Sequence, residues 1–169
     1  MDAIEAIHGR RSIRSYTDEP VSEEDIDVLL EAAMAAPSAG NQQPWHFVVI
    51  DERRLLDAIP EYHQYAAMLR EAPLAIAVCG DMEEEKHEGF WVQDCSAAVE
   101  NLLVAVHARG LGAVWLGVHP DPERVRGTQQ LLNLPDQVVP LAIISIGHPA
   151  EEKPPTTYYD PARVHHNRW

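Results

Sequence analysis

The segment GFWVQDCSAAVENLLVAVHAR, residues 89–109, has the composition of one long helix and ends before Gly110. Apolar residues lie around most of the girth of this predicted helix rather than along a single stripe. A helix with so wide an apolar surface must be buried on several sides, and in a chain of 169 residues another subunit is one candidate for covering a side. The apolar members are Phe90, Trp91, Val92, Ala97, Ala98, Val99, Leu102, Leu103, Val104 and Val106.

Helical and strand patterns alternate on both sides of this segment, which predicts an α/β or α+β domain around one mixed sheet. No repeat or interdomain linker divides the chain, so we expect a single domain over residues 1–169, with 149–169 as an extended tail. Ser22 followed by Asp25 resembles a capping box at a helix start. The predicted helices cover 3–9, 22–36, 53–69 (one or two short helices divided by Pro60) and 122–132, and the predicted strands cover 45–50, 74–79, 113–118 and 138–146.

The charge balance limits the kinds of partner. Asp and Glu number 27 against 13 Lys and Arg, for a net charge of -14, which argues against nucleic acid and anionic membrane surfaces. Residues 1–9 lack the apolar core of a secretory signal, and no apolar stretch is long enough to span a membrane. We therefore expect a cytoplasmic protein.

Cysteine and histidine give little sign of reactive or metal chemistry. Cys79 and Cys95 form no CxxC pair and are expected to be small buried residues in a reducing compartment. The nine histidines are scattered, except for the adjacent His165 and His166, and adjacent residues seldom point into one metal site. Because the histidines are scattered, we expect no metal site. We also expect no Ser–His–Asp triad, because no GxSxG motif is present.

Three of the 13 basic residues fall within RRSIR, residues 10–14, in an otherwise acidic chain. Clustered guanidinium groups gain most from a fixed anion such as a phosphate, and Ser12 adds a hydroxyl donor. The alternative is a set of exposed arginines that closes a helix C-terminus, where positive charge is favoured.

Two further segments are candidates for ligand binding. The segment PSAGNQQP, residues 37–44, offers neutral donors and acceptors that suit a planar heterocycle, although an ordinary polar turn has the same composition. The segment GLGAVWLG, residues 110–117, is neither a dinucleotide fingerprint nor a Walker A motif. Its Gly117 falls within a strand pattern, where a glycine often marks the close approach of a ligand or another backbone.

Taken together, the segments resemble the FMN-dependent nitroreductase family, in particular a short subgroup of it. The resemblance runs in order through RRSIRSY (10–16), APSAGNQQPWHFVVI (36–50), QDCSAAVENLL (93–103), GLGAVWLG (110–117) and IGHPAEEKPP (146–155), and includes the VHHNRW ending. It implies an α+β fold with a mixed sheet flanked by helices. It also implies a homodimer that holds the flavin between its subunits, with the long helix buried at the centre.

The resemblance also implies roles for individual residues. Arg10 and Ser12 would hold the FMN phosphate with help from Arg11, and Arg14 would lie near the pyrimidine edge of the ring, where a cation stabilises the negative charge of reduced flavin. The remaining matches are Pro37, Ser38, Ala39 and Asn41, with Gln43 nearby, in a loop from the other subunit, and Leu116 and Gly117 in the strand whose backbone amide faces flavin N5.

One departure from the family pattern concerns the tail. Many relatives have basic residues soon after the PAEEKP segment to hold the phosphate, whereas this chain has Thr156 and Thr157 there. If the role is kept, Arg168, or less favourably Arg163, must take it.

The function implied is an FMN-dependent oxidoreductase with a ping-pong mechanism. NADH or NADPH would pass hydride to N5, and a nitroaromatic, a quinone or another flavin would then accept it, with FMN rather than a protein nucleophile carrying the chemistry. Two alternatives stay open. One is the same fold with another flavin reaction, such as dehydrogenation, dehalogenation or flavin breakdown, and the other is a flavin-binding protein without turnover.

Overall fold

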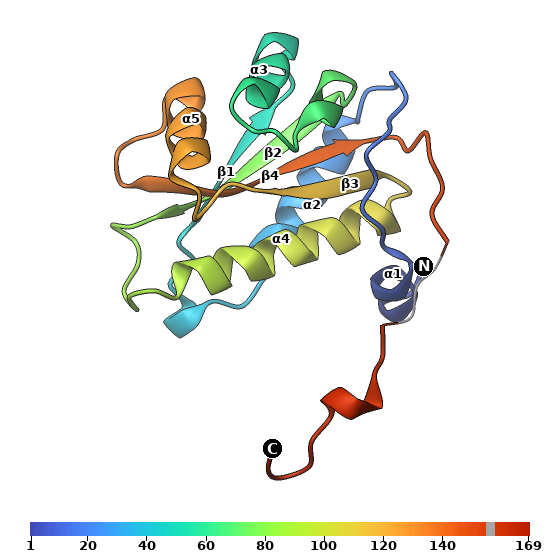
Figure 1. Cartoon of the computed structure of the whole chain (residues 1–169), viewed down its shortest axis with the longest axis vertical. Coiled ribbons are helices and arrows are strands. Elements are labelled where there is room, and N and C mark those ends of the chain that lie inside the picture. The colour runs from blue at the N-terminus through green and yellow to red at the C-terminus, as the bar shows by residue number, and fades with distance from the viewer. Residues whose placement is uncertain (155–157) are drawn as a thin grey trace.

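Four antiparallel strands form the centre of the molecule, in the order β1-β2-β4-β3. Figure 1 shows the sheet with helices on both of its faces. The structure, a computed structural model, describes residues 1–154 and 158–169, so Thr156 and Thr157 lie outside the described residues. The strands are β1 (Trp45–Ile50), β2 (Leu74–Asp81), β3 (Gly112–Gly117) and β4 (Val138–Gly147).

The expected α+β class is confirmed, and the pairing of the strands adds a detail. All three pairings between the named strands are antiparallel, and the parallel component is an isolated bridge between Ser12 and Ala113 at the β3 edge. That bridge places the RRSIR segment directly beside β3.

The apolar run at 74–79 is buried because the sheet is covered on both faces. Leu74, Ile76 and Val78 belong to the core on one face, and the alternate residues Ala75, Ala77 and Cys79 belong to the core on the other. A strand buried on both faces is expected to lack polar alternation, which is why its sequence reads as a continuous apolar run.

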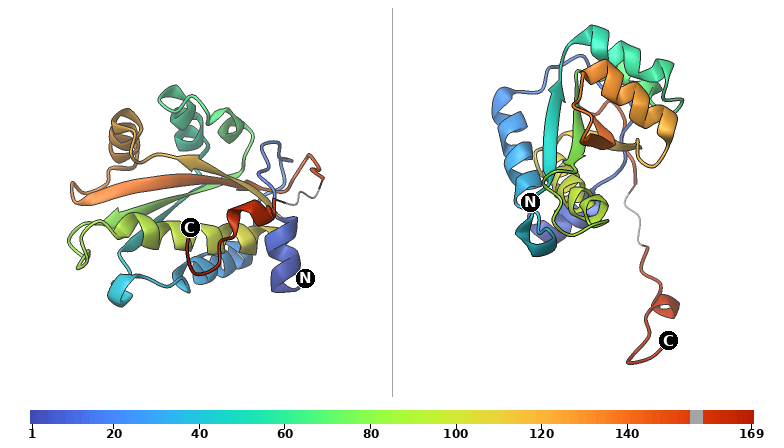
Figure 2. Two further views of the ribbon diagram at one scale, coloured as in Figure 1. Left: turned by 60° about the horizontal axis from the view of Figure 1, so that its bottom comes forward. Right: turned by 90° about the vertical axis from the view of Figure 1, so that its left-hand side faces the viewer.

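The helices divide between the two faces, as the right-hand view of Figure 2 shows. Helices α2 (Glu23–Met34) and α4 (Trp91–Ala108) pack together in the core on one face, and α3 (Arg53–Ala58) and α5 (Pro122–Leu132) cover the other. Helix α1 (Ala3–Gly9) lies against α4. No helix among the described residues is long and apolar enough to cross a membrane.

Helix α4 is buried on its sheet side, as its composition predicts. Leu102 is fully buried, whereas Val92, Ala97 and Val104 are only half-buried in the single chain. The apolar surface of α4 is therefore wider than one chain covers, and whether a second copy covers the rest stays a prediction.

Local sequence signals account for several element boundaries. The Ser22 hydroxyl accepts a hydrogen bond from the backbone N–H of Asp25 and starts α2, which confirms the predicted cap. The helical expectation over 53–69 was too continuous, because α3 is followed by two short 3-10 turns, η2 (Ile59–Glu61) and η3 (Ala67–Arg70). Pro60 lies in the first of these turns, where its missing N–H costs nothing.

Candidate functional site

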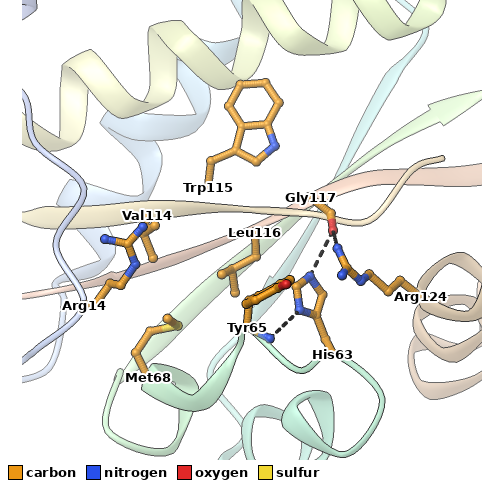
Figure 3. A pocket seen from close by; sticks show the side chains of 9 residues that line it. All are labelled: Arg14, His63, Tyr65, Met68, Val114, Trp115, Leu116, Gly117 and Arg124. Atoms are coloured by element: carbon orange, nitrogen blue, oxygen red, sulfur yellow. Dashed lines mark hydrogen bonds between the residues drawn. The ribbon is translucent and has the colours of Figure 1, made fainter. Parts of the chain in front are cut away.

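A cavity of about 410 Å³ opens between β3 and the segments that cover that face of the sheet. Its volume lies in the usual range for small-molecule sites, roughly 300–1,000 Å³. Figure 3 shows aromatic, aliphatic and basic side chains around it from several elements, with the Trp115 ring turned toward α4 on the other side of β3. The lining residues are Arg14, His63, Tyr65, Met68, Val114, Trp115, Leu116, Gly117 and Arg124.

Three of the residues predicted from sequence come together here: Arg14, Leu116 and Gly117. Ile13 donates its N–H to the carbonyl of Ala113 at 2.9 Å and is itself buried, which fixes the strand-like course of this segment along β3. Arg14 follows at the cavity. The side chain of Leu116 packs into the core on the same face as the cavity.

Gly117 gives the cavity a surface of bare backbone. A Cβ placed on Gly117 would meet nothing within 4 Å, so the space beside this residue is open. A flat ring could therefore approach the end of β3 closely, which is the reason a glycine is useful at this position. This local shape fits the isoalloxazine ring of a flavin.

Arg10 has a charge that is paired with Glu100 and a buried side-chain nitrogen that lacks a hydrogen bond within the described structure. Its Nε is buried and has no hydrogen-bond partner among the described residues, although a carboxylate oxygen of Glu100 lies 3.5 Å away. A buried donor without a partner costs free energy, so this position suits an anionic ligand. The cavity lining among the described residues includes neither Arg10 nor Ser12, so their phosphate role stays a prediction.

Arg11, unlike Arg10 and Arg14, uses its guanidinium to bind backbone carbonyls within the described structure. Its guanidinium donates to the backbone carbonyls of His8 (2.8 Å) and Arg10 (2.6 Å) at the end of α1, and to the carbonyl of Pro154 at 2.9 Å. These contacts match the helix-closing alternative for this one residue, since the last carbonyls of a helix lack partners within it.

A segment near the C-terminus runs beside residues 12–17 and holds them in place. The backbone of His148 accepts from Thr17 and that of Ala150 donates to Ser15, each at 2.9 Å. Lys153 Nζ donates to the Ser12 carbonyl. The first residues of the predicted tail are therefore part of the framework that positions the arginines.

Glu151 is the member of this framework closest to Arg14. One of its carboxylate oxygens accepts a hydrogen bond from the Arg14 backbone N–H at 2.6 Å, and this bond is the largest cause that lowers the pKa of Glu151. Lys153, 3.2 Å from the same carboxylate, lowers that pKa further. Sequence reasoning did not identify Glu151, since its partner is a backbone group 137 residues away.

The 37–43 loop lies apart from the cavity in the same chain. The cavity lining among the described residues includes none of the predicted loop members, which are Pro37, Ser38, Ala39, Asn41 and Gln43. The loop joins α2 to β1 and contains the short turn η1 (Ala39–Asn41), which Figure 1 shows beyond the first turn of α4. A site that includes both the cavity residues and this loop would need a second copy of the chain.

A buried polar network holds this loop. Asp94, only 4% exposed, accepts hydrogen bonds from the Ala39 N–H at 2.9 Å and from Gln42 Nε2 at 2.6 Å. The side-chain oxygen of Gln42 accepts from the N–H groups of Lys86 and His87. The network supports an unusual backbone, since Asn41 and Gln43 have φ values of 56° and 50°.

The end of the tail does not bring Arg168 to the RRSIR segment within one chain. Both figures show residues 158–169 running away from the body of the molecule. The Arg168 side chain is exposed, and the ring of Trp169 stacks on His165 with centroids 4.4 Å apart. Arg163 is likewise exposed and lies 3.4 Å from Asp160. Neither tail arginine is placed at the phosphate position by the single chain.

The cavity also contains residues that sequence reasoning missed, above all His63, Tyr65 and Arg124. Arg124 lies with its guanidinium carbon 5.3 Å from the centre of the Tyr65 ring. No motif marks them. The segment at 53–69 was read only as helical, and Arg124 is one of two arginines in the first turns of α5, of which Arg126 is exposed.

One cluster away from the cavity has metal-ligand chemistry. His46 Nε2 lies 3.1 Å from a carboxylate oxygen of Glu84 and 3.9 Å from one of Asp81. His46 and Glu84 are exposed, and their side chains form a hydrogen bond with each other. We assign no metal ion to this cluster on the basis of these contacts.

The two cysteines are buried, as expected, and remain free thiols. Burial raises the pKa of both Cys79 and Cys95 to about 12. The Cys95 thiol donates to the carbonyl of Cys79. Neither thiol is a nucleophile near neutral pH, because the reactive form is the thiolate.

An antiparallel sheet between helical layers, with a backbone-floored cavity beside a basic segment, defines an α+β protein built to hold a flat anionic ligand. The model of the nitroreductase family matches residues 7–64 and 59–148. The chain therefore belongs to the nitroreductase family, a family of oxidoreductases, and the resemblance noted in the sequence is confirmed.

Individual relatives are similar to this chain over nearly its whole length. A protein of Methanothermobacter thermautotrophicus, provisionally named NADH dehydrogenase/NAD(P)H nitroreductase, is 51% identical over 100% of this chain and 88% of its own. A crystal structure from Parabacteroides distasonis under the same provisional name is 42% identical, with a TM-score of 0.95, over 99% of this chain and 98% of its own. A provisionally named nitroreductase from Desulfovibrio desulfuricans, solved in complex with FMN, is 35% identical with a TM-score of 0.86, over 100% and 98%.

Proposed function

We propose that this chain is an FMN-dependent oxidoreductase that takes electrons from NADH or NADPH and delivers them to a small acceptor such as a nitroaromatic or a quinone. The observation that carries the proposal is the cavity in which Arg14 and the open backbone at Gly117 meet. The names of the relatives, which include NAD(P)H nitroreductase, and the FMN complex of one of them support it.

The protein's part is to bind, orient and provide charge. Arg10, whose Nε has no hydrogen bond within the described residues, and Ser12 would hold the phosphate. Arg14 would lie by the pyrimidine edge of the ring and stabilise negative charge there. Bound FMN would supply the hydride chemistry through N5. Arg11 and Glu151 contribute by holding the segment that presents these groups.

The strand end forms the other side of the ring site. Leu116 and Gly117 would present backbone to the ring, and the cavity beside Tyr65 and Met68 would leave room for donor and acceptor in turn. Apolar walls at Val114 and Leu116 would exclude water from one side of the reacting atoms.

We further propose that the active form is a homodimer. The 37–43 loop lies away from the cavity of its own chain, and α4 has a half-buried apolar strip with Ala97 and Val104, seven residues apart, on one side of the helix. A second copy that covers this strip would complete the ring site with Pro37, Ser38, Ala39, Asn41 and Gln43. Arg168, on the outstretched tail, would reach the phosphate only in that assembly.

We also propose a cytoplasmic location for this protein, because its two buried free thiols suit a reducing cytoplasm.

Steady-state oxidation of NADH and of NADPH, each with and without a nitroaromatic, tests the proposal. We expect the FMN-loaded protein to oxidise at least one nucleotide faster when the acceptor is present. Bound FMN with no turnover of either nucleotide would favour the flavin-binding alternative. Nucleotide oxidation that no nitroaromatic or quinone accelerates would favour another flavin reaction.

A further inference from the structure

The carbonyl of Gly117 is held by two side chains from different elements. His63 Nε2 lies 2.9 Å from it, and Arg124 donates to it through Nη1 at 3.0 Å. Figure 3 shows both contacts converging on the end of β3. His63 comes from the turn between η2 and η3, and Arg124 from α5. Because glycine has the widest backbone freedom, these contacts add to the pairing of Gly117 with Ala142 of β4 in fixing its conformation.

The surroundings of His63 define its protonation. The ring is only 1% exposed, and its Nδ1 faces the backbone N–H of Tyr65 at 3.4 Å, so Nδ1 accepts. The proton therefore sits on Nε2, which donates to Gly117. A second proton on Nδ1 would set two N–H groups against each other.

The charged groups around the ring favour the same neutral form. Burial is the largest cause that lowers the pKa of His63, and Arg124 lowers it further. The Gly117 carbonyl and Asp121 of α5 act in the opposite direction but do not reverse the shift. Arg14 is the other titratable cation of the cavity lining, and Tyr65 lies edge-on to the imidazole ring.

We propose that His63 and Arg124 are positioning residues that fix the last peptide groups of β3 against the flavin ring. The proposal rests on the proposed function, in which the Leu116–Gly117 backbone faces N5. A hydrogen-bond donor preset at the reacting atom needs no reorganisation during the reaction, and a strand end that moves loses this advantage. Neither side chain has to touch the reacting atoms for this effect.

Three variants separate the hydrogen bond from bulk and burial. His63→Leu keeps much of the volume and removes the donor, whereas His63→Gln places an amide N–H near the position of Nε2. His46→Gln removes a histidine outside the cavity and is the matched control. Each variant is loaded with FMN, and the reduction potential of the bound flavin and the rate of its reduction by NADH or NADPH are measured from pH 5 to 8. In the cofactor-free wild type, ¹⁵N NMR of His63 reports the tautomer.

We expect the rate of flavin reduction to fall about tenfold in His63→Leu, as for one lost hydrogen bond at the reacting face, and to stay within about twofold of wild type in His63→Gln. The wild-type rate should decline as the pH falls below the ordinary pKa of histidine, and His63→Gln should flatten that decline while His46→Gln keeps it. NMR should show a neutral ring protonated at Nε2, and the flavin potential should shift in His63→Leu alone.

Equal rates and equal potentials in all variants, or an equal loss in His63→Leu and His63→Gln, would overturn the positioning role while FMN binding and turnover stand. If His63→Leu does not fold, the Gln variant, the pH profile and the NMR tautomer decide alone, and a proton on Nδ1 contradicts the proposal. A wild-type protein that takes up no FMN overturns this inference together with the proposed function.

Discussion

Asp94 accepts a hydrogen bond from Gln42 Nε2 at 2.6 Å and thereby ties the first turns of α4 to the loop between α2 and β1. The same carboxylate holds the Ala39 N–H. Because Asn41 and Gln43 in this loop have left-handed backbone conformations, the loop depends on such contacts for its shape. The helix that forms the core thus also sets the geometry of the loop that we assign to the partner's flavin site.

Removal of this carboxylate should destabilise the protein strongly. Asp94→Ala leaves the Ala39 N–H and the Gln42 amide without their buried partner, which should cost about 2–4 kcal/mol. Urea unfolding measures the loss. Asp27→Asn, at an exposed carboxylate on α2, is the control and should change the free energy of unfolding by less than about 0.5 kcal/mol. Equal effects at the two sites would show that the network does not hold the loop.

Arg14 should set the potential of the bound flavin. Arg14→Ala removes the cation from the cavity and should lower the reduction potential of FMN by about 30 mV, which for a two-electron couple equals about 1.4 kcal/mol. The fold should stay intact, because the side chain is exposed. Spectroelectrochemical titration of the variant gives the potential.

The control for this measurement is Arg126→Ala, which removes an exposed arginine of α5 that does not line the cavity. Its potential should match that of the wild type. An unchanged potential in Arg14→Ala would remove the electronic role assigned to this residue and leave the phosphate role of Arg10 and Ser12 unaffected.

Glu151 should make stability depend on pH. Its pKa is lowered in the folded state, chiefly by the Arg14 backbone N–H, so its stabilising contribution is present above the ordinary pKa of glutamate. That contribution is lost as the pH falls through the lowered value. The difference in Tm between wild type and Glu151→Ala should therefore be largest near neutral pH and shrink in acid. Glu152→Ala, at the exposed neighbouring carboxylate, should show no such trend, and a constant difference for Glu151→Ala would contradict the assignment.

The two thiols should resist alkylation in the native protein. With pKa values raised to about 12 and full burial, Cys79 and Cys95 should react with iodoacetamide at pH 8 at least about 100-fold more slowly than in urea. Mass spectrometry counts the adducts. Rapid labelling of either residue in the folded state would mean that the sheet opens easily.

Much of the framework could be predicted from local patterns. The strand at 45–50 and the helix at 122–132 have the predicted bounds, because β-branched and aromatic composition, proline and capping residues act over a few residues. A division at Pro60 was predicted, but the two 3-10 turns over 59–70 were not, since such short turns have no distinctive sequence period.

Some residues of the candidate site could likewise be predicted from sequence, and others could not. Arg14, Leu116 and Gly117 could be identified because their motifs are contiguous in sequence, and the structure brings them to one cavity. His63 and Arg124 could not, because their shared partner is a backbone carbonyl that only the tertiary fold brings to them. The 37–43 loop shows a further limit, since a single chain places it away from the cavity lining.

Titration of the purified, cofactor-free protein with FMN, followed by the fluorescence of the flavin, tests the central claim most directly. We predict saturable binding with one FMN per chain, tighter than the binding of riboflavin, because we assign Arg10 and Ser12 to the phosphate that riboflavin lacks. A fluorescence that rises in proportion to added FMN, with no saturation and no difference between FMN and riboflavin, would contradict it.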